Sequence, residues 1–356
     1  MKQLFSLLLV LFSYLGIAQY TDVINSNRPG LAVSAYAVGK NVVQAEMGIF
    51  FEQQDHSLLN TESNILGTDI ALRYGLLFEQ LEIKWEGSFA NQNITFTNFD
   101  MEDSRTDFTR NRLGLKYLVY DRYKDPERNK PNLYSWRKNN LFQLKNLIPS
   151  VSLYAGATFV LGDNPFYVGD PTVSPRVMVA TQSRLTPRSV LITNFGYDRI
   201  GTDFPERAYL ISYSYAFRNP KWSAFIEHQG TQSDRYADLL LRSGVAHLLN
   251  EDFQIDVNLG TSLKNTPSRI FLVMGASYRL DFHKDPKTQS IEEQKAGENG
   301  GEIKKNTMKK MEREERKKAK KGLGAEDVDL GPSKKQLRKK KKADKKKKKD
   351  TGVIDF

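Results

Sequence analysis

The sequence predicts an all-β fold: a transmembrane, antiparallel, up-and-down β-barrel of about twelve strands with a Lys-rich C-terminal tail. Three observations predict it. Segments of alternating polar and apolar residues recur as far as residue 282, the last of them resembles a barrel-targeting strand, and the charge balance changes directly after it. Alternation is the mark that a membrane-spanning strand leaves in a sequence, because its successive side chains face lipid and lumen in turn.

The first 18 residues have the form of a secretory signal peptide. Lys2 supplies the positive start, residues 4–15 are an apolar run, and Gly16-Ile17-Ala18 is a small-x-small cleavage site. The run is shorter than the roughly 18–20 residues that a membrane-spanning helix needs, which argues against an anchor. The chain has no cysteine, which excludes disulfides and a lipid attached to cysteine. We therefore predict an exported protein.

The expected strands are justified by the same alternation throughout. In residues 78–89, for example, Ile83 and Trp85 alternate with Glu82, Lys84 and Glu86. The alternation is least clear at residues 222–229. The predicted strands are residues 42–53, 65–76, 78–89, 108–120, 148–161, 175–185, 189–197, 207–217, 222–229, 238–248, 253–261 and 270–282. Their number is even, as in single-chain bacterial barrels.

The connections between these strands suggest an orientation, because such barrels have long outer loops and short periplasmic turns. Residues 19–41 are expected to be a periplasmic segment that leads into the barrel, so both termini would be periplasmic. Residues 121–147 are a basic exception among the short turns, with a short amphipathic helix expected around residues 136–147. The expected outer loops are residues 54–64, 90–107, 162–174, 198–206, 230–236 and 264–268.

A soluble barrel or sandwich is the alternative fold for twelve alternating strands. Aromatic residues near the strand ends favour the membrane barrel, since such barrels carry aromatic girdles at both interfaces. They are Tyr74, Trp85, Tyr117, Tyr209, Trp222 and Phe282.

The final strand carries Gly275, Tyr278, Leu280 and Phe282, a spacing that resembles the last-strand signal for insertion by the barrel-assembly machinery. In most such barrels this signal ends the chain, whereas here residues 283–356 follow it. These residues hold 25 Lys and Arg against 14 Asp and Glu, a net charge of +11 that equals the charge of the whole chain. We therefore predict that the barrel covers residues 42–282 and that residues 283–356 are a separate, basic periplasmic tail.

The inward face of the barrel is predicted to carry charges of both signs. Two interpretations stay open: a lumen plugged by salt bridges, or a polar conduit with a ligand site. Barrels of about eight strands are filled by side chains and those of 16–18 hold a water channel, so twelve strands do not decide. The candidate lumen-lining residues are Glu46, Glu52, Asp69, Arg73, Glu82, Lys84, Glu86, Arg112, Lys116, Arg176, Arg184, Asp256 and Arg279.

No catalytic, cofactor or metal site is expected. The four histidines fall in no metal-ligand pattern. Ser243 with His247 is the nearest approach to a hydrolase pair, and a histidine at the membrane interface is the favoured interpretation.

The tail predicts contacts with anions. Residues 291–321 have charges at helical spacing, and the lysine block at residues 334–349 is expected to be disordered. Export argues against nucleic acid, which leaves peptidoglycan, lipid headgroups and acidic envelope proteins as expected partners.

Short motifs at both ends of the barrel resemble one known family. Asn27-Arg28-Pro29-Gly30 and residues 44–48 resemble its opening, and residues 254–258 and 275–280 resemble its last hairpin. The family is that of outer-membrane barrels named for the MetA pathway of phenol degradation. The resemblance covers roughly residues 22–282 and implies passage of small, often aromatic, molecules.

These observations predict an outer-membrane channel or transporter for small, aromatic or hydrophobic molecules in a Gram-negative cell. The alternative is an accessory barrel that transports nothing. In that case its tail and residues 121–147 would bind the cell wall or an envelope complex.

Overall fold

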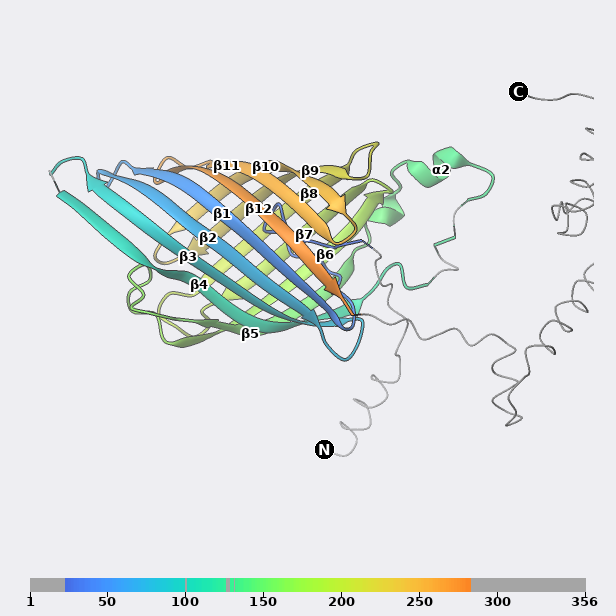
Figure 1. Cartoon of the computed structure of the whole chain (residues 1–356), viewed down its shortest axis with the longest axis horizontal. Coiled ribbons are helices and arrows are strands. Elements are labelled where there is room, and N and C mark those ends of the chain that lie inside the picture. Colours follow the sequence, from blue (N-terminus) through green and yellow to red (C-terminus); the bar gives the residue numbers. More distant parts are fainter. Residues whose placement is uncertain (1–22, 100, 126–128, 131, 283–356) are drawn as a thin grey trace, which may run out of the picture. The chain divides into compact units, whose positions relative to one another are not determined.

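The computed structural model describes residues 23–99, 101–125, 129–130 and 132–282, which contain a closed barrel of twelve antiparallel strands (Figure 1). Each strand pairs with its neighbours in sequence, and β1 closes the barrel against β12. The strands are β1 (Val42–His56), β2 (Thr61–Gly75), β3 (Leu81–Phe96), β4 (Met101–Tyr120), β5 (Ser150–Phe159), β6 (Val173–Thr186), β7 (Ser189–Asp198), β8 (Glu206–Ala216), β9 (Trp222–Ser233), β10 (Ala237–Asn250), β11 (Phe253–Ser262) and β12 (Ser268–Asp281). The predicted fold class and strand number are confirmed.

The outer face of the barrel is apolar and exposed, whereas its polar side chains point inward. In β1, Met47, Ile49 and Phe51 are 50%, 57% and 45% exposed, while Glu46 and Glu52, on the other face at either end of this run, are buried. Closure of the sheet leaves no strand edge unpaired. The buried part of the barrel is thus its interior, which is mainly polar and holds a smaller set of apolar side chains such as Met178 and Leu210.

The strands reach further than the sequence predicted at what we call the far end, opposite the near end where β1 begins and β12 finishes. Residues 90–107 were expected to be a loop, but β3 continues to Phe96 and β4 starts at Met101 (Figure 1). Asn91 and Asn93 on one face and Gln92 on the other make this part of the hairpin polar on both faces, which removes the alternation that marks a half-buried strand. The loop expected at residues 54–64 is shortened in the same way.

At the near end, the connection between β4 and β5 contains the short helix α2 (Trp136–Asn140) and the 3-10 turn η1 (Leu144–Leu147). Ser135 caps α2 by accepting a hydrogen bond from the Lys138 N–H at 3.2 Å. The helix expected over residues 136–147 is therefore confined to its first turn. Among the described residues, no helix has the length and apolar character to cross a membrane.

The chain divides into two units, Met1–Lys284 and Asp285–Phe356. The predicted signal peptide and the predicted tail lie outside the described residues.

Candidate functional site

Residues 23–41 run through the barrel interior, which corrects their predicted place as a periplasmic segment leading into the barrel. We call them the lumen segment. Their contacts pass around the wall: Ser26 lies 2.7 Å from Ser277 of β12, the Val33 N–H donates to Asn194 of β7 at 2.7 Å, and the Val38 N–H donates to Glu82 of β3 at 3.0 Å. A segment without periodicity cannot pair its own backbone groups, so inward-facing wall side chains satisfy them.

Glu227 of β9 is fully buried and binds the middle of the lumen segment. Its carboxylate accepts from the backbone N–H of Leu31 and of Ala32, each at 3.1 Å, and pairs with Arg242 of β10 at 3.5 Å. Charge-assisted hydrogen bonds of this kind are roughly twice as strong as neutral ones. Glu227 therefore fixes the backbone of the segment at the centre of the lumen.

Arg28 ties the segment to β11. Its Nη2 and Nε donate to the two carboxylate oxygens of Asp256 at 2.9 and 3.1 Å, and the Asp256 side chain is fully buried. The guanidinium occupies space left by Gly48 of β1 and Gly275 of β12, which face each other in register. A Cβ at Gly275 would lie 2.1 Å from the guanidinium, so only glycine leaves room there.

Between the lumen segment and the near end, a buried charge network fills the near half of the lumen. Glu82 accepts from Arg73 at 2.9 Å and from Lys116 at 2.9 Å, and all three side chains are fully buried. Arg73 also donates to the backbone of Asn25, and Lys116 donates to the carbonyl oxygens of Ser34 and Tyr36, each at 2.9 Å. This half of the lumen matches the plugged interpretation.

Tyr36 closes the near end beside β5. Its hydroxyl donates to Asp121 at 3.0 Å and lies 2.8 Å from the Ser150 hydroxyl. Burial, above all, raises the pKa of the Tyr36 phenol, so it stays protonated and continues to donate.

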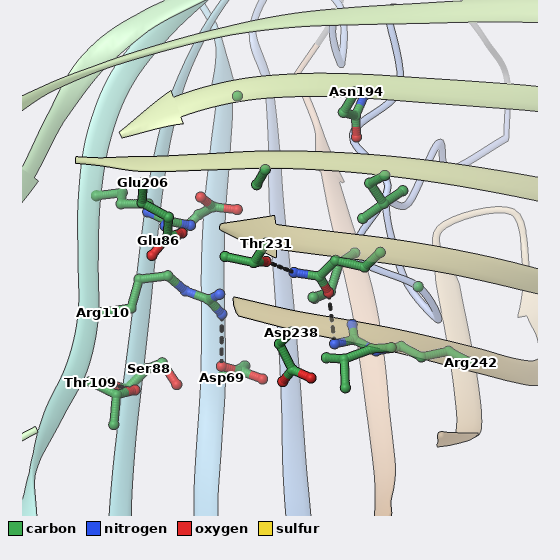
Figure 2. Close-up of a pocket in the computed structure, with 18 of the residues that line it drawn as sticks. Asp69, Glu86, Ser88, Thr109, Arg110, Asn194, Glu206, Thr231, Asp238 and Arg242 are labelled. Atoms are coloured by element: carbon green, nitrogen blue, oxygen red, sulfur yellow. Dashed lines mark hydrogen bonds and ion pairs between the residues drawn. The ribbon is translucent and has the colours of Figure 1, made fainter. Parts of the chain in front are cut away.

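Between the lumen segment and the far end, the lumen holds a cavity of about 320 Å³ (Figure 2). Its floor is formed by Arg28, Gly30, Leu31 and Val33 of the lumen segment. Seven arginines and five carboxylates line it, together with an apolar group. The apolar wall residues include Phe50, Met178, Leu210, Leu240, Phe271 and Val273. The cavity can therefore hold a small molecule that has both apolar and polar parts.

The cavity charges are paired between strands, some of them adjacent in the sheet and others on separate parts of the wall. Arg269 of β12 binds Glu52 of β1 at 2.6 Å, and Asp198 of β7 accepts from Arg112 and Arg176 at 2.6 and 2.7 Å. Figure 2 shows the Arg110–Asp69 pair, whose atoms lie 3.2 Å apart. Its side chains are 30% and 26% exposed, which makes it one of the more hydrated pairs in the lumen.

A smaller pocket of about 60 Å³ continues past the lumen segment on its β1–β4 side. It shares Asp69, Glu86 and Arg110 with the cavity and reaches Glu46 and Lys84.

Loops at the far end pack over part of the cavity. Asp170, in the β5–β6 loop, pairs with Arg199 at 2.7 Å and Arg235 at 2.9 Å. Arg199 also pairs with Glu206 and lies over the Tyr167 ring at 4.2 Å. Burial lowers the pKa of Arg199, but Glu206, Tyr167 and Asp170 together raise it above the ordinary value, so the loop cluster stays charged.

The structure separates the thirteen sequence-selected residues into three groups. Glu52, Asp69, Glu86, Arg112 and Arg176 line the cavity. A second group lies beside the lumen segment and consists of Glu46, Arg73, Glu82, Lys84, Lys116 and Asp256. A third group lies at the near end, where Arg184 lies over the Tyr123 ring and Arg279 pairs with Asp252.

Several site residues were not selected from the sequence. Four of them each lie within a predicted strand at an inward-facing position, so strict alternation would have found them; they are Arg110, Glu227, Asp238 and Arg242. Arg28 lies in a segment without periodicity, and no strand pattern could have found it.

His247, which with Ser243 is the nearest approach to a hydrolase pair in the sequence, packs on Trp222, with ring centroids 4.2 Å apart. Among the described residues, no group of three or more His, Asp or Glu side chains could hold a metal ion.

The family described as "Putative MetA-pathway of phenol degradation" matches residues 26–280. The chain belongs to this family. The match starts within the lumen segment and finishes within β12, so it spans the segment and the barrel that surrounds it. A comparison with curated protein sequences finds no match.

Among the solved structures that are similar to this chain are three channels or transporters. An outer-membrane channel from Pseudomonas putida F1 has 10% identity and a TM-score of 0.45, covering 72% of this chain and 100% of its own. The P. putida toluene transporter TodX has 10% identity and a TM-score of 0.41, covering 75% and 99%. The monoaromatic hydrocarbon channel CymD has 10% identity and a TM-score of 0.37, covering 69% and 90%.

Proposed function

We propose that this protein is an outer-membrane channel for small molecules, with the cavity as the solute site and the lumen segment as its closure. The observation that carries the proposal is the cavity of about 320 Å³ between the lumen segment and the far-end loops. Its size falls within the range of about 300–1,000 Å³ that is usual for small-molecule sites. Its mixed lining suits small aromatic or apolar molecules that carry a polar group.

The apolar outer face supports a membrane location. Side chains such as Ile49, Ile211 and Leu259 are 57%, 42% and 58% exposed on the barrel wall, an arrangement that lipid stabilises and water does not. We place both chain ends in the periplasm. A tail with 25 Lys and Arg does not cross lipid, because each central charge costs about 2–4 kcal/mol on a barrel.

We propose that solute leaves the cavity beside Asp69 and Arg110. This pair stands where the cavity meets the smaller pocket. Because both side chains are partly hydrated, the pair contributes about 1 kcal/mol or less and separates easily. Onward passage then requires the lumen segment to shift, since its hydrogen bonds close the near half of the lumen.

The test is solute uptake by liposomes that contain the purified chain. We expect entry of small aromatic molecules such as phenol or benzoate, and Ala208→Trp should slow it because Ala208 lines the cavity. Ala155→Trp is the matched control, since Ala155 is exposed on the outer face of β5. Absence of uptake for every solute, with a correctly folded barrel, would refute the channel.

A second candidate function is an accessory barrel that binds the cell wall or an acidic envelope protein. The observation that favours it is an uncovered apolar and basic surface at the near end. Leu133, Tyr134 and Trp136 are 88%, 99% and 78% exposed beside Arg137 and Lys138. We propose that residues 334–349, by their positive charge, would bind the same class of partner.

Sedimentation with isolated peptidoglycan tests this second function. Retention should weaken as salt rises, because exposed charges are screened within about 10 Å at 0.1 M salt. It should also fall on deletion of residues 284–356. Retention that ignores salt would contradict a contact driven by charge.

We also propose that the barrel-assembly machinery reads the end of β12. Tyr278, Leu280 and Phe282 are 47%, 44% and 62% exposed on the outer wall. Phe282→Ala should reduce the fraction of heat-modifiable barrel in the outer membrane, whereas Leu259→Ala on β11 should not. Equal assembly of the two variants would argue against the signal.

A further inference from the structure

An apolar groove of about 660 Å³ lies on the outer wall near the far end, across β7, β8, β9 and β10. Strand register arranges its lining in two rows. The row nearer the rim is Tyr197, Arg207, Gln232 and Ala237, and the row below it is Phe195, Tyr209, Gly230 and Leu239. The rim row is polar and the lower row is apolar.

The lower row is shaped by a glycine. The Tyr209 ring of the neighbouring strand lies over Gly230, in the space that a side chain at residue 230 would need. A Cβ at that position would be only 2.2 Å from Tyr209 Cε1. Tyr209 also stacks on His228, with ring centroids 5.6 Å apart. This packing holds the aromatic ring against the wall and leaves an apolar recess beside Phe195 and Leu239.

Two cations stand at the rim of the groove. Arg207 is exposed, with its guanidinium 5.8 Å from the Tyr197 ring centre. Lys264 reaches over from the β11–β12 loop, and its Nζ donates to the Ala237 carbonyl at 2.8 Å. The one carboxylate in the lining, Asp238, binds Arg269 instead. Within the part of the chain that the structure describes, neither rim cation has an acidic partner in an ion pair.

We propose that this groove binds one lipid with a phosphorylated headgroup. Its acyl chain lies along Phe195, Tyr209 and Leu239, and its phosphate lies between Arg207 and Lys264. Arginine and lysine bind phosphate oxygens through charge-assisted hydrogen bonds, and the apolar row continues the lipid-facing wall. The inference rests on the proposed membrane location and is independent of whether the lumen conducts. In the proposed orientation the lipid belongs to the outer leaflet.

The test is lipid binding to the full chain in detergent, followed by native mass spectrometry. The probes are phosphatidylglycerol and diacylglycerol with the same chains, and inorganic phosphate as competitor. The natural chain should retain phosphatidylglycerol in preference to diacylglycerol. Arg207→Gln with Lys264→Gln should weaken its binding about 30-fold, as expected when two cations near an anionic headgroup are neutralised.

The matched control is Arg218→Gln with Lys221→Gln, which removes the same charge from the β8–β9 turn at the near end. This variant should bind phosphatidylglycerol as the natural chain does. Equal losses in both double variants, or no preference over diacylglycerol, would overturn the site. Complete displacement by inorganic phosphate would show an anion site without the lipid. Solute uptake should be unchanged in both variants, so failure here is distinguishable from failure of the channel.

Discussion

Arg28→Ala is the most informative perturbation of the lumen. It removes both hydrogen bonds to Asp256, at 2.9 and 3.1 Å, from a pair whose side chains are 10% and 0% exposed. Breaking a buried pair by removing one partner costs roughly 3–5 kcal/mol, largely because the other charge stays buried. Arg28 also lines the cavity, so water can reach Asp256 and reduce that cost to about 2–3 kcal/mol. The population of undocked lumen segment should therefore rise about 30- to 150-fold.

Amide hydrogen exchange measures this population directly. The backbone N–H groups of Leu31 and Ala32 are bound by Glu227, and that of Val33 by Asn194, so they exchange when the segment leaves the wall. We expect their protection to fall by the same factor in Arg28→Ala, and channel openings to become more frequent. Adding Asp256→Ala should restore part of the protection, since no charge is then left unpaired.

Arg105→Ala is the matched control. Its partner is Asp103, and the two side chains are 40% and 45% exposed, so the loss should be below about 1 kcal/mol. Unchanged exchange at residues 31–33 in Arg28→Ala would refute the anchoring role of Arg28. Faster exchange with unchanged uptake would show that the segment loosens without controlling passage.

Three further predictions follow from the same interior. Ser26→Cys with Ser277→Cys places two thiols where hydroxyls lie 2.7 Å apart in a chain that has no cysteine, so oxidation should lock the lumen segment to β12. Solute uptake should fall on oxidation and return on reduction. Identical uptake in both states would mean that the segment does not need to move. Gly275→Ala puts a Cβ 2.1 Å from the Arg28 guanidinium and should loosen the lumen segment as Arg28→Ala does. Gly196→Ala, where the nearest atom to the new Cβ is 3.8 Å away, should not. Similar amide hydrogen exchange at residues 31–33 in the two variants would refute the steric argument. Glu82→Gln leaves Lys116 buried without a carboxylate and leaves Arg73 only its longer pair with Glu46 at 3.5 Å, so it should destabilise the barrel by roughly 3–5 kcal/mol. The measurement is a lower urea midpoint of the heat-modifiable band, and an unchanged midpoint would show that this network does not stabilise the barrel.

Hydrophobic alternation determined most of the wall. It predicted all twelve strands, because the side chains of a strand report locally, every second residue, which face meets lipid. The same rule placed charges such as Glu82, Arg112 and Asp256 on the inward face. It failed where β3 and β4 extend to Phe96 and from Met101, since polar residues on both faces leave no alternation to read.

Tertiary structure alone decided what fills the lumen. The sequence left a salt-bridged plug and a polar conduit as alternatives, and the structure shows a filled near half beneath an open cavity. The reason is that Arg28–Asp256 and Leu31–Glu227 join residues about two hundred positions apart, across the barrel rather than along a strand. Alternation fixes which way a side chain points. Only closure of the sheet around the lumen segment fixes which side chain it meets.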